Sequence, residues 1–260
     1  MAQVSEAGSR RDSASALGRL TLTELKLFGR DRVGPIWGVG FPLVLLIIFG
    51  SIPAFRQPVS QSAPGLTVLD AYVPILIGFV LAMLGINTLA AVLAGYREKG
   101  VLRRLAVTPV GAGRVLAAQL AVHVAVAATA LIALLAVARV AYGVPLPRQP
   151  LGFAAAVVLA TAALLGIGLF IAAVAPTGRM ASAIGAVVFF PMMFFAGLWL
   201  PIAAMPRVLQ HISHVTPLGA AVQALTDSWQ GHWPQPLQLL ALASYALVFA
   251  LGAARLFRWE

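Results

Sequence analysis

The chain has 260 residues, of which 60% are hydrophobic and only 10% are charged, with a formal net charge of +10. An ordinary soluble domain is about 45–50% apolar and about 25% charged, so this chain has too few charges to cover a water-exposed surface. Disordered chains are poor in apolar residues, which excludes disorder for most of the sequence. The absence of cysteine excludes disulfides, thiolate metal sites and a cysteine nucleophile. The composition indicates a helical protein that crosses a membrane several times.

Six apolar runs approach the length of roughly 20 residues that a membrane helix needs. They carry almost no charge and lack the alternation of a barrel strand, so helices are predicted. The basic segment before them has no long apolar core and does not resemble a cleavable signal peptide, so the first span should be retained. The predicted spans are Ile36–Ile52, Ala71–Ala94, Val115–Val137, Leu151–Val174, Ala181–Leu200 and Leu237–Ala254. We therefore predict an all-α polytopic membrane protein, with six transmembrane helices in residues 34–254.

Basic residues are distributed unevenly between the two sides of these spans. Of the 18 Lys and Arg residues, 14 fall in the N-terminal segment, the loops after the second and fourth spans, and the C-terminal tail. Loops rich in Lys and Arg stay in the cytoplasm, so both termini are predicted to be cytoplasmic. Basic residues beside anionic head groups explain the net charge. Nucleic-acid binding is not expected, because these residues are scattered over four segments without a recognition fold.

The segments that flank the spans differ in character. Residues 1–14 are small and polar, which predicts a disordered tail, and residues 255–260 form a short cytoplasmic tail. Residues 15–33 predict an interfacial amphipathic helix, because apolar and basic side chains fall on opposite arcs. The external loop before the last span contains two helix-like pieces, Pro206–His214 and Leu218–Trp229. These pieces predict a re-entrant hairpin that dips into the outer leaflet.

The longest cytoplasmic loop, residues 95–114, predicts a short amphipathic helix over Glu98–Ala106. Glu98 is expected at the helix start, where a carboxylate suits the helix dipole. Thr108-Pro109 should end the helix, because a proline disfavours helical conformation at the preceding residue. The pattern alone leaves two interpretations, namely a helix lying flat on the inner leaflet or a helix that docks into a groove on a cytoplasmic partner.

The chain shows no arrangement suited to covalent chemistry of its own. A P-loop requires G-x-x-x-x-G-K-[ST], and neither of the two lysines follows a glycine. His211 and His214 are three residues apart and could hold a metal with Asp227 or His232, although structural roles are the preferred interpretation. We therefore predict no catalytic site, no metal site and no cofactor bound by this chain.

Polar residues inside membrane spans are costly and are therefore candidates for function. Asn87 in the second span and His123 in the third each require an interhelical partner or water, so each either joins helices or lines a substrate path. The aromatic cluster of the fifth span, which includes Phe190 and Phe194, faces either lipid or an apolar path.

Three separated stretches, taken in order, resemble the type-2 permease family of ATP-binding-cassette (ABC) exporters, and within it the daunorubicin-resistance-like drug-export branch. They are Leu27–Arg32 (LFGRDR) with Phe41-Pro42, Arg97–Val110 (REKGVLRRLAVTPV), and Phe195–Ile202 (FAGLWLPI) with Met205-Pro206 and Thr216–Leu218. With six spans of matching order, the resemblance covers nearly the whole chain.

The resemblance implies a cytoplasmic coupling helix that seats on a separate ATPase subunit. The residues that match the family's coupling loop are Arg97, Glu98, Gly100, Leu102, Arg103, Arg104, Leu105, Thr108 and Pro109. In similar exporters the second and fifth spans line the path at the interface of two permeases. That places Asn87, Phe190 and Phe194 near substrate, and His123 joins them as a polar residue within a span.

The resemblance also implies two ATPase copies, a second permease copy that is identical or a sister chain, and ATP with Mg²⁺ on the partner subunit. The expected function is ATP-driven export of a hydrophobic or amphipathic substrate across a bacterial plasma membrane. The expected substrate is a drug, an antibiotic or a lipid, because the spans carry almost no charge that could bind an ionic solute. Two alternatives remain: a permease for polysaccharide or glycolipid, and a non-transporting membrane sensor or assembly subunit.

Overall fold

The computed structural model describes residues 36–58, 67–101, 104 and 112–256. The predicted tail of residues 1–14, the predicted amphipathic helix of residues 15–33 and residues 257–260 lie outside this part. Within it every regular element is a helix, which confirms the predicted all-α class there. The elements are η1 (Ile36–Gly40), α3 (Phe41–Ser51), η2 (Pro53–Arg56), α4 (Val68–Ala82), η3 (Met83–Leu89), α5 (Ala90–Glu98), α7 (Ala112–Tyr142), α8 (Pro150–Val174), α9 (Gly178–Phe195), η4 (Ile202–Ala204), α10 (Arg207–Val215), α11 (Pro217–Gln230) and α12 (Pro236–Leu256).

Five of the described helices are long and apolar enough to cross a membrane. They run over Val68–Glu98, Gly113–Tyr142, Pro150–Val174, Gly178–Phe195 and Pro236–Leu256, and they match the second to sixth predicted spans. The first predicted span, Ile36–Ile52, contains a shorter apolar helix over Gly38–Ser51. The protein is therefore a multi-pass membrane protein, and the sixth crossing stays a prediction.

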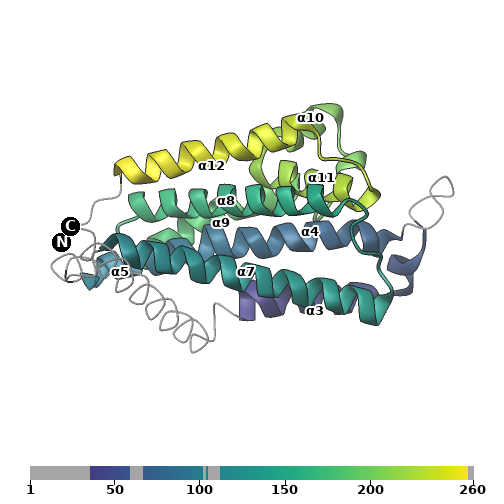
Figure 1. Cartoon of the computed structure of the whole chain (residues 1–260), viewed down its shortest axis with the longest axis horizontal. Coiled ribbons are helices and arrows are strands. Elements are labelled where there is room, and N and C mark those ends of the chain that lie inside the picture. Colours follow the sequence, from purple (N-terminus) through teal and green to yellow (C-terminus); the bar gives the residue numbers. More distant parts are fainter. Residues whose placement is uncertain (1–35, 59–66, 102–103, 105–111, 257–260) are drawn as a thin grey trace, which may run out of the picture.

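The second span is a composite helix in the middle of the bundle. It consists of α4, the π-helical segment η3 and α5. It is the most buried of the five spans, because 72% of its most apolar stretch is buried inside the structure. It contacts α3, α7, α8, α9 and α11. Figure 1 shows α4 between α7 on one side and α8 on the other, with α12 beyond α8. The second span is thus the element against which the others are positioned.

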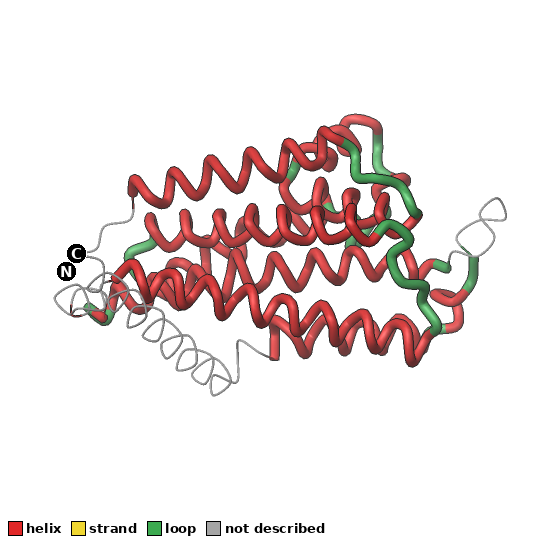
Figure 2. The backbone as a smooth tube through the Cα atoms, viewed as in Figure 1, coloured by secondary structure: helices red, strands yellow, loops and turns green. Residues whose placement is uncertain are grey.

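The loops gather at the two ends of the bundle, as Figure 2 shows. At the end opposite α5, the short helices α10 and α11 pack against each other and against α9 and α12 (Figure 1). The Ser213 hydroxyl of α10 donates to the Phe195 carbonyl oxygen at 2.6 Å, which fixes the pair to the end of α9. The two predicted helical pieces are present, with each boundary shifted by one residue. Their insertion into the outer leaflet stays a prediction.

The fifth span ends earlier than the sequence predicts. Helix α9 stops at Phe195, five residues before the predicted end at Leu200. Gly197 has a φ of +88°, a left-handed conformation that favours glycine, so the backbone turns there and leaves the helix axis. The apolar run continues through the turn, which is why composition alone placed its end too late.

Candidate functional site

A cavity of about 450 Å³ lies between α3, the second span and α9. Its volume falls within the range of about 300–1,000 Å³ that is usual for small-molecule sites. Among the described residues that line it, the Asn87 amide is the only polar side-chain group apart from the Trp199 indole N–H. The lining residues are Phe41, Leu45, Phe49, Phe79, Met83, Asn87, Ala186, Phe189, Phe190, Met193, Leu198 and Trp199.

The π-helical segment of the second span places Asn87 in this wall. Segment η3 covers Met83–Leu89, and the Thr88 hydroxyl donates back to the Met83 carbonyl oxygen at 3.3 Å. Helix α9 comes close here, since a Cβ on Gly185 would lie 2.9 Å from both Asn87 Oδ1 and the Ile86 carbonyl oxygen. Short π-helical segments inside α-helices are rare and occur often at functional sites. The sequence therefore provides a helix irregularity, a close helix contact and a polar side chain at one level.

The aromatic side chains of the wall come from three different helices. Phe79 of α4 and Phe189 of α9 meet edge to face at 5.3 Å between ring centroids, and Phe41 of α3 lies 5.5 Å from Phe79. Phe190 and Trp199 stack at 6.4 Å on the more open side. Such a wall can hold an apolar molecule through burial and ring contacts, while the Asn87 amide can donate or accept a hydrogen bond.

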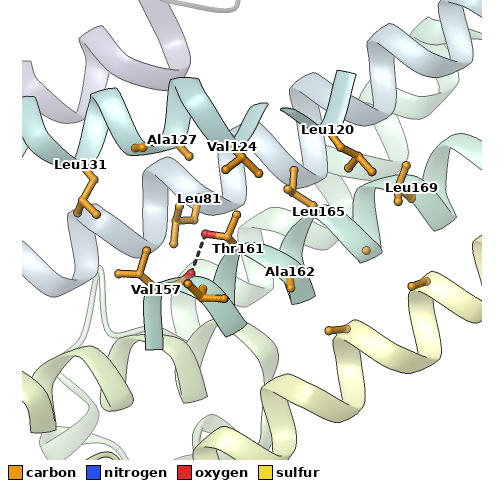
Figure 3. Close-up of a pocket in the computed structure, with 15 residues that line it drawn as sticks. Leu81, Leu120, Val124, Ala127, Leu131, Val157, Thr161, Ala162, Leu165 and Leu169 are labelled. Atoms are coloured by element: carbon orange, nitrogen blue, oxygen red, sulfur yellow. Dashed lines mark hydrogen bonds between the residues drawn. The ribbon is translucent and has the colours of Figure 1, made fainter. Parts of the chain in front are cut away.

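A second, larger hollow of about 580 Å³ lies between α7 and α8, with α12 along one edge (Figure 3). The one polar side-chain group among its described lining residues is the Thr161 hydroxyl, which donates to the Val157 carbonyl oxygen of its own helix at 2.7 Å. Val124 and Val158 at its rim are exposed. Since no polar group is left to orient a ligand, this hollow offers less specificity than the cavity around Asn87.

The structure separates the four predicted path residues. Asn87 and Phe190 both line the 450 Å³ cavity. Phe194 lines neither hollow and packs edge to face on Phe195 at 5.4 Å. His123 also lines neither hollow. It is only 1% exposed within α7, with Nδ1 2.8 Å from the Gln119 carbonyl oxygen.

A buried polar residue near His123, Gln119, was missed by the sequence analysis. Gln119 of α7 is 3% exposed, and its Nε2 donates to the Tyr96 hydroxyl of α5 at 3.3 Å. This polar contact joins the second and third spans near the loop after α5. Gln119 lies four residues before His123 in the same predicted span, so the same search for polar residues within spans would have found it.

Four of the nine predicted coupling residues are described, namely Arg97, Glu98, Gly100 and Arg104. Leu102, Arg103, Leu105, Thr108 and Pro109 lie outside the described residues. The predicted start of the loop helix at Glu98 is wrong, because Glu98 is the last residue of α5. The break comes at Gly100, whose φ is +64°, and helical geometry resumes at Val101.

Arg97 is half-buried and Glu98 is exposed, and the side chains of both bind the turn between α8 and α9. Arg97 Nη1 donates to the Ala173 carbonyl oxygen at 2.9 Å, and Nη2 donates to the Ala175 carbonyl oxygen. One Glu98 carboxylate oxygen accepts from the Gly178 backbone N–H at 3.0 Å. Arg104 is also exposed, and its side chain donates to the Lys99 carbonyl oxygen of its own segment at a long 3.4 Å.

Within the described residues, the histidines of α10 and of the segment after α11 do not gather a metal-binding set. Among the described residues, no group of three or more His, Asp or Glu side chains is close enough to hold an ion. Asp227 instead accepts a hydrogen bond from Gln238 Nε2 at 2.9 Å, which ties the end of α11 to the start of α12. This contact supports a structural role for Asp227.

Comparison with known protein families identifies the family to which the chain belongs. The family model for the ABC-2 type transporter matches residues 15–228, which is most of the chain. A search of the curated proteins finds no match. The matched region covers the helices that build the cavity, the loop after α5 and the turn that Arg97 and Glu98 contact. The chain belongs to the ABC-2 type transporter family and is a membrane-spanning permease component of an ABC transporter.

Proposed function

We propose that this permease exports a hydrophobic or amphipathic molecule, such as a drug, an antibiotic or a lipid, using ATP hydrolysed on a separate subunit. The observation that carries the proposal is the apolar, aromatic cavity around Asn87. A ligand in this cavity would contact almost only carbon atoms, with one amide to fix its orientation. A strongly charged solute would lose its hydration there without gaining a partner.

The proposed assembly contains two permeases and two ATPases in a bacterial plasma membrane, with the termini in the cytoplasm. Phe190 is 59% exposed and Trp199 is 55% exposed, so the wall on this side is open and suits closure by a second permease, either identical or a sister chain. ATP and Mg²⁺ would bind the ATPases. Closure of the ATPase pair would push the loop after α5 and favour the outward-open state through its different contacts in the two states.

Glycolipid or polysaccharide export is the second candidate, because half of the residues in the cavity wall are aromatic and aromatic rings suit sugar faces. A glycan, however, carries many hydroxyl groups, each of which is costly to bury without a partner. One amide and one indole N–H in the wall cannot satisfy many of them. A substrate with a long apolar part therefore fits the wall better.

The test begins with the tagged chain, purified from its native membranes in mild detergent and analysed by mass spectrometry. We expect a P-loop ATPase in stoichiometric amount. Inside-out vesicles containing the complex should then accumulate a hydrophobic dye or a fluorescent lipid with ATP, but not with a non-hydrolysable analogue. No ATPase in the purified sample would favour the sensor or assembly alternative, and transport of glycolipid alone would favour the second candidate.

A further inference from the structure

Two adjacent residues of the second span contact both sides of the turn between α8 and α9. Arg97 donates to the carbonyl oxygens of Ala173 and Ala175 at the end of α8, and Glu98 accepts from the N–H of Gly178 at the start of α9. The positive side chain thus lies at a helix C-terminus and the negative one at a helix N-terminus. Both charges match the helix dipoles they meet. We call this arrangement the Arg97–Glu98 clamp.

The backbone contact beneath the clamp is close. A Cβ on Gly178 would lie 3.1 Å from the Ala91 carbonyl oxygen and 3.4 Å from the Gly95 Cα, so the start of α9 rests directly on α5. Gly185 rests on Asn87 and Ile86 in the same way. Gly178 and Gly185 are seven residues apart and therefore share one face of α9. The cytoplasmic half of α9 is joined to the second span at two levels.

We propose that Arg97 and Glu98 are positioning residues. They couple the α8–α9 turn and the first half of α9 to the cytoplasmic end of the second span, so that these segments move together during transport. The inference rests on the proposed function, in which an ATPase pushes the loop after α5. A displacement of Glu98 would pull on Gly178 at the start of α9. The same helix carries Phe189 and Phe190, so the movement reaches the cavity wall.

The charged residues at the end of α5 and in the loop after it have different tasks in this arrangement. Arg97 is half-buried and Glu98 is exposed, but the polar atoms of both are already bound to the backbone at the α8–α9 turn, so both act within the permease. Arg104 is exposed as well, but its side chain bonds to the Lys99 carbonyl oxygen of its own segment, so it is left to meet the ATPase. A motif that looks like one docking surface in the sequence therefore divides into a part that binds the permease itself and a part that is free to meet the partner.

Substitutions at Glu98 separate the clamp from direct binding of the ATPase. Glu98→Gln keeps an oxygen that accepts from the Gly178 N–H but removes the charge, whereas Glu98→Ala removes both. If Glu98 positions α9, Glu98→Gln should transport within about twofold of wild type and Glu98→Ala should lose about tenfold, the range expected for loss of a helix cap. Both variants should retain the ATPase in a pull-down. Lys99→Ala, an exposed neighbour, is the matched control and should transport normally.

Hydrogen–deuterium exchange of the complete complex tests the movement itself. In wild type, addition of nucleotide should change exchange both in the loop after α5 and in residues 174–182. In Arg97→Ala/Glu98→Ala, the loop should still respond while residues 174–182 no longer respond. A merely stabilising role would raise exchange in the turn without removing its nucleotide response, which would overturn the inference.

Two further outcomes are informative. Equal defects in Glu98→Gln and Glu98→Ala, with loss of the ATPase, would show that the partner binds the charge and would overturn the clamp as the mode of action. Absence of an ATPase from wild type would overturn the proposed function and the inference with it. That result would leave the clamp itself measurable as slow exchange of the Gly178 amide in the isolated permease.

Discussion

Gly168 of α8 and Gly85 of the second span meet backbone to backbone where the two helices cross. A Cβ on Gly168 would lie 1.9 Å from the Gly85 carbonyl oxygen, and a Cβ on Gly85 would lie 2.7 Å from the carbonyl carbon and oxygen of Leu164. Neither position accepts a methyl group at this helix separation. Small residues at such crossings allow close van der Waals contact between membrane helices. The crossing thus fixes α8 against η3, the segment that carries Asn87.

Gly168→Ala should therefore destabilise the permease. The helices would have to separate, and overpacking of this kind costs about 1–3 kcal/mol, which corresponds to a lower melting temperature of several degrees. Gly166→Ala is the matched control on the same helix, because its Cβ would lie 3.5 Å from the Ala246 carbonyl oxygen, an ordinary contact. Thermal unfolding of the purified proteins in detergent measures the difference. Equal melting temperatures for the two variants would show that the crossing is looser than the structure has it.

A second crossing, at the other end of the bundle, predicts coupling between α3 and α7. A Cβ on Gly50 would lie 2.5 Å from the ring of Tyr142, whose hydroxyl donates to the Ile47 carbonyl oxygen at 3.1 Å. Gly50→Ala should displace the ring and break this bond. The same change should cost much less in a Tyr142→Ala background, with a coupling free energy of about 0.5–3 kcal/mol in a double-mutant cycle. Additive losses of stability would contradict the contact.

Much of the fold follows from local sequence, because each span is a long apolar run that has no alternative to a helix in a bilayer. The ends of the spans are less predictable. The end of the fifth span depends on the left-handed backbone of Gly197, and glycine is also common inside membrane helices. Composition therefore located α9 but not its last turn.

The prediction for Glu98 had the correct kind of interaction, a carboxylate at a helix N-terminus, but assigned it to the wrong helix. The sequence analysis placed its carboxylate at a helix N-terminus, and the structure does so too, but the helix is α9, which begins 80 residues later in the chain at Gly178. The carbonyl groups that Arg97 binds are equally remote in sequence. No spacing rule within one segment can indicate such contacts, because they depend on how the spans pack.

The same limit applies to the cavity. Asn87 and Phe190 were placed near substrate through family resemblance, and both lie in the wall. Phe41 entered the sequence analysis only through the Phe41-Pro42 motif and Phe49 not at all, since nothing in the first apolar run marks which face turns toward α9. Which residues line the cavity depends on how α3, the second span and α9 pack against one another.

The helix cap at the start of the second span should contribute measurably to stability. The Asp70 backbone N–H donates to the Thr67 hydroxyl at 3.2 Å, and the Thr67 N–H donates to the Asp70 carboxylate at 2.7 Å. Thr67→Ala should destabilise the protein by about 0.5–2 kcal/mol, and Thr67→Ser should be close to neutral because it keeps the hydroxyl. Denaturation of the purified variants measures both changes. A loss in Thr67→Ser as large as that in Thr67→Ala would mean that the methyl group matters rather than the cap.

The cavity predicts which substitutions change substrate preference. Asn87→Ala removes the amide, so a substrate that hydrogen-bonds it should show a KM raised about two- to tenfold, as expected from a hydrogen bond worth about 0.5–1.5 kcal/mol. A substrate without polar groups should be transported as before. Phe190→Ala removes part of the apolar wall and should raise the KM of both substrates alike. The measurement is ATP-dependent uptake into inside-out vesicles over a series of substrate concentrations.

Phe194→Ala is the control for the same assay, because Phe194 lies four residues from Phe190 on α9 but outside the cavity. It should leave both KM values within about twofold of wild type, since it removes no group from the wall. If Phe194→Ala instead matched Phe190→Ala, the substrate would contact more of α9 than this cavity includes. If Asn87→Ala affected both substrates equally, the amide would act by holding η3 against α9, since its Oδ1 lies beside Gly185. The two substrates together thus distinguish recognition by Asn87 from support of the helix contact.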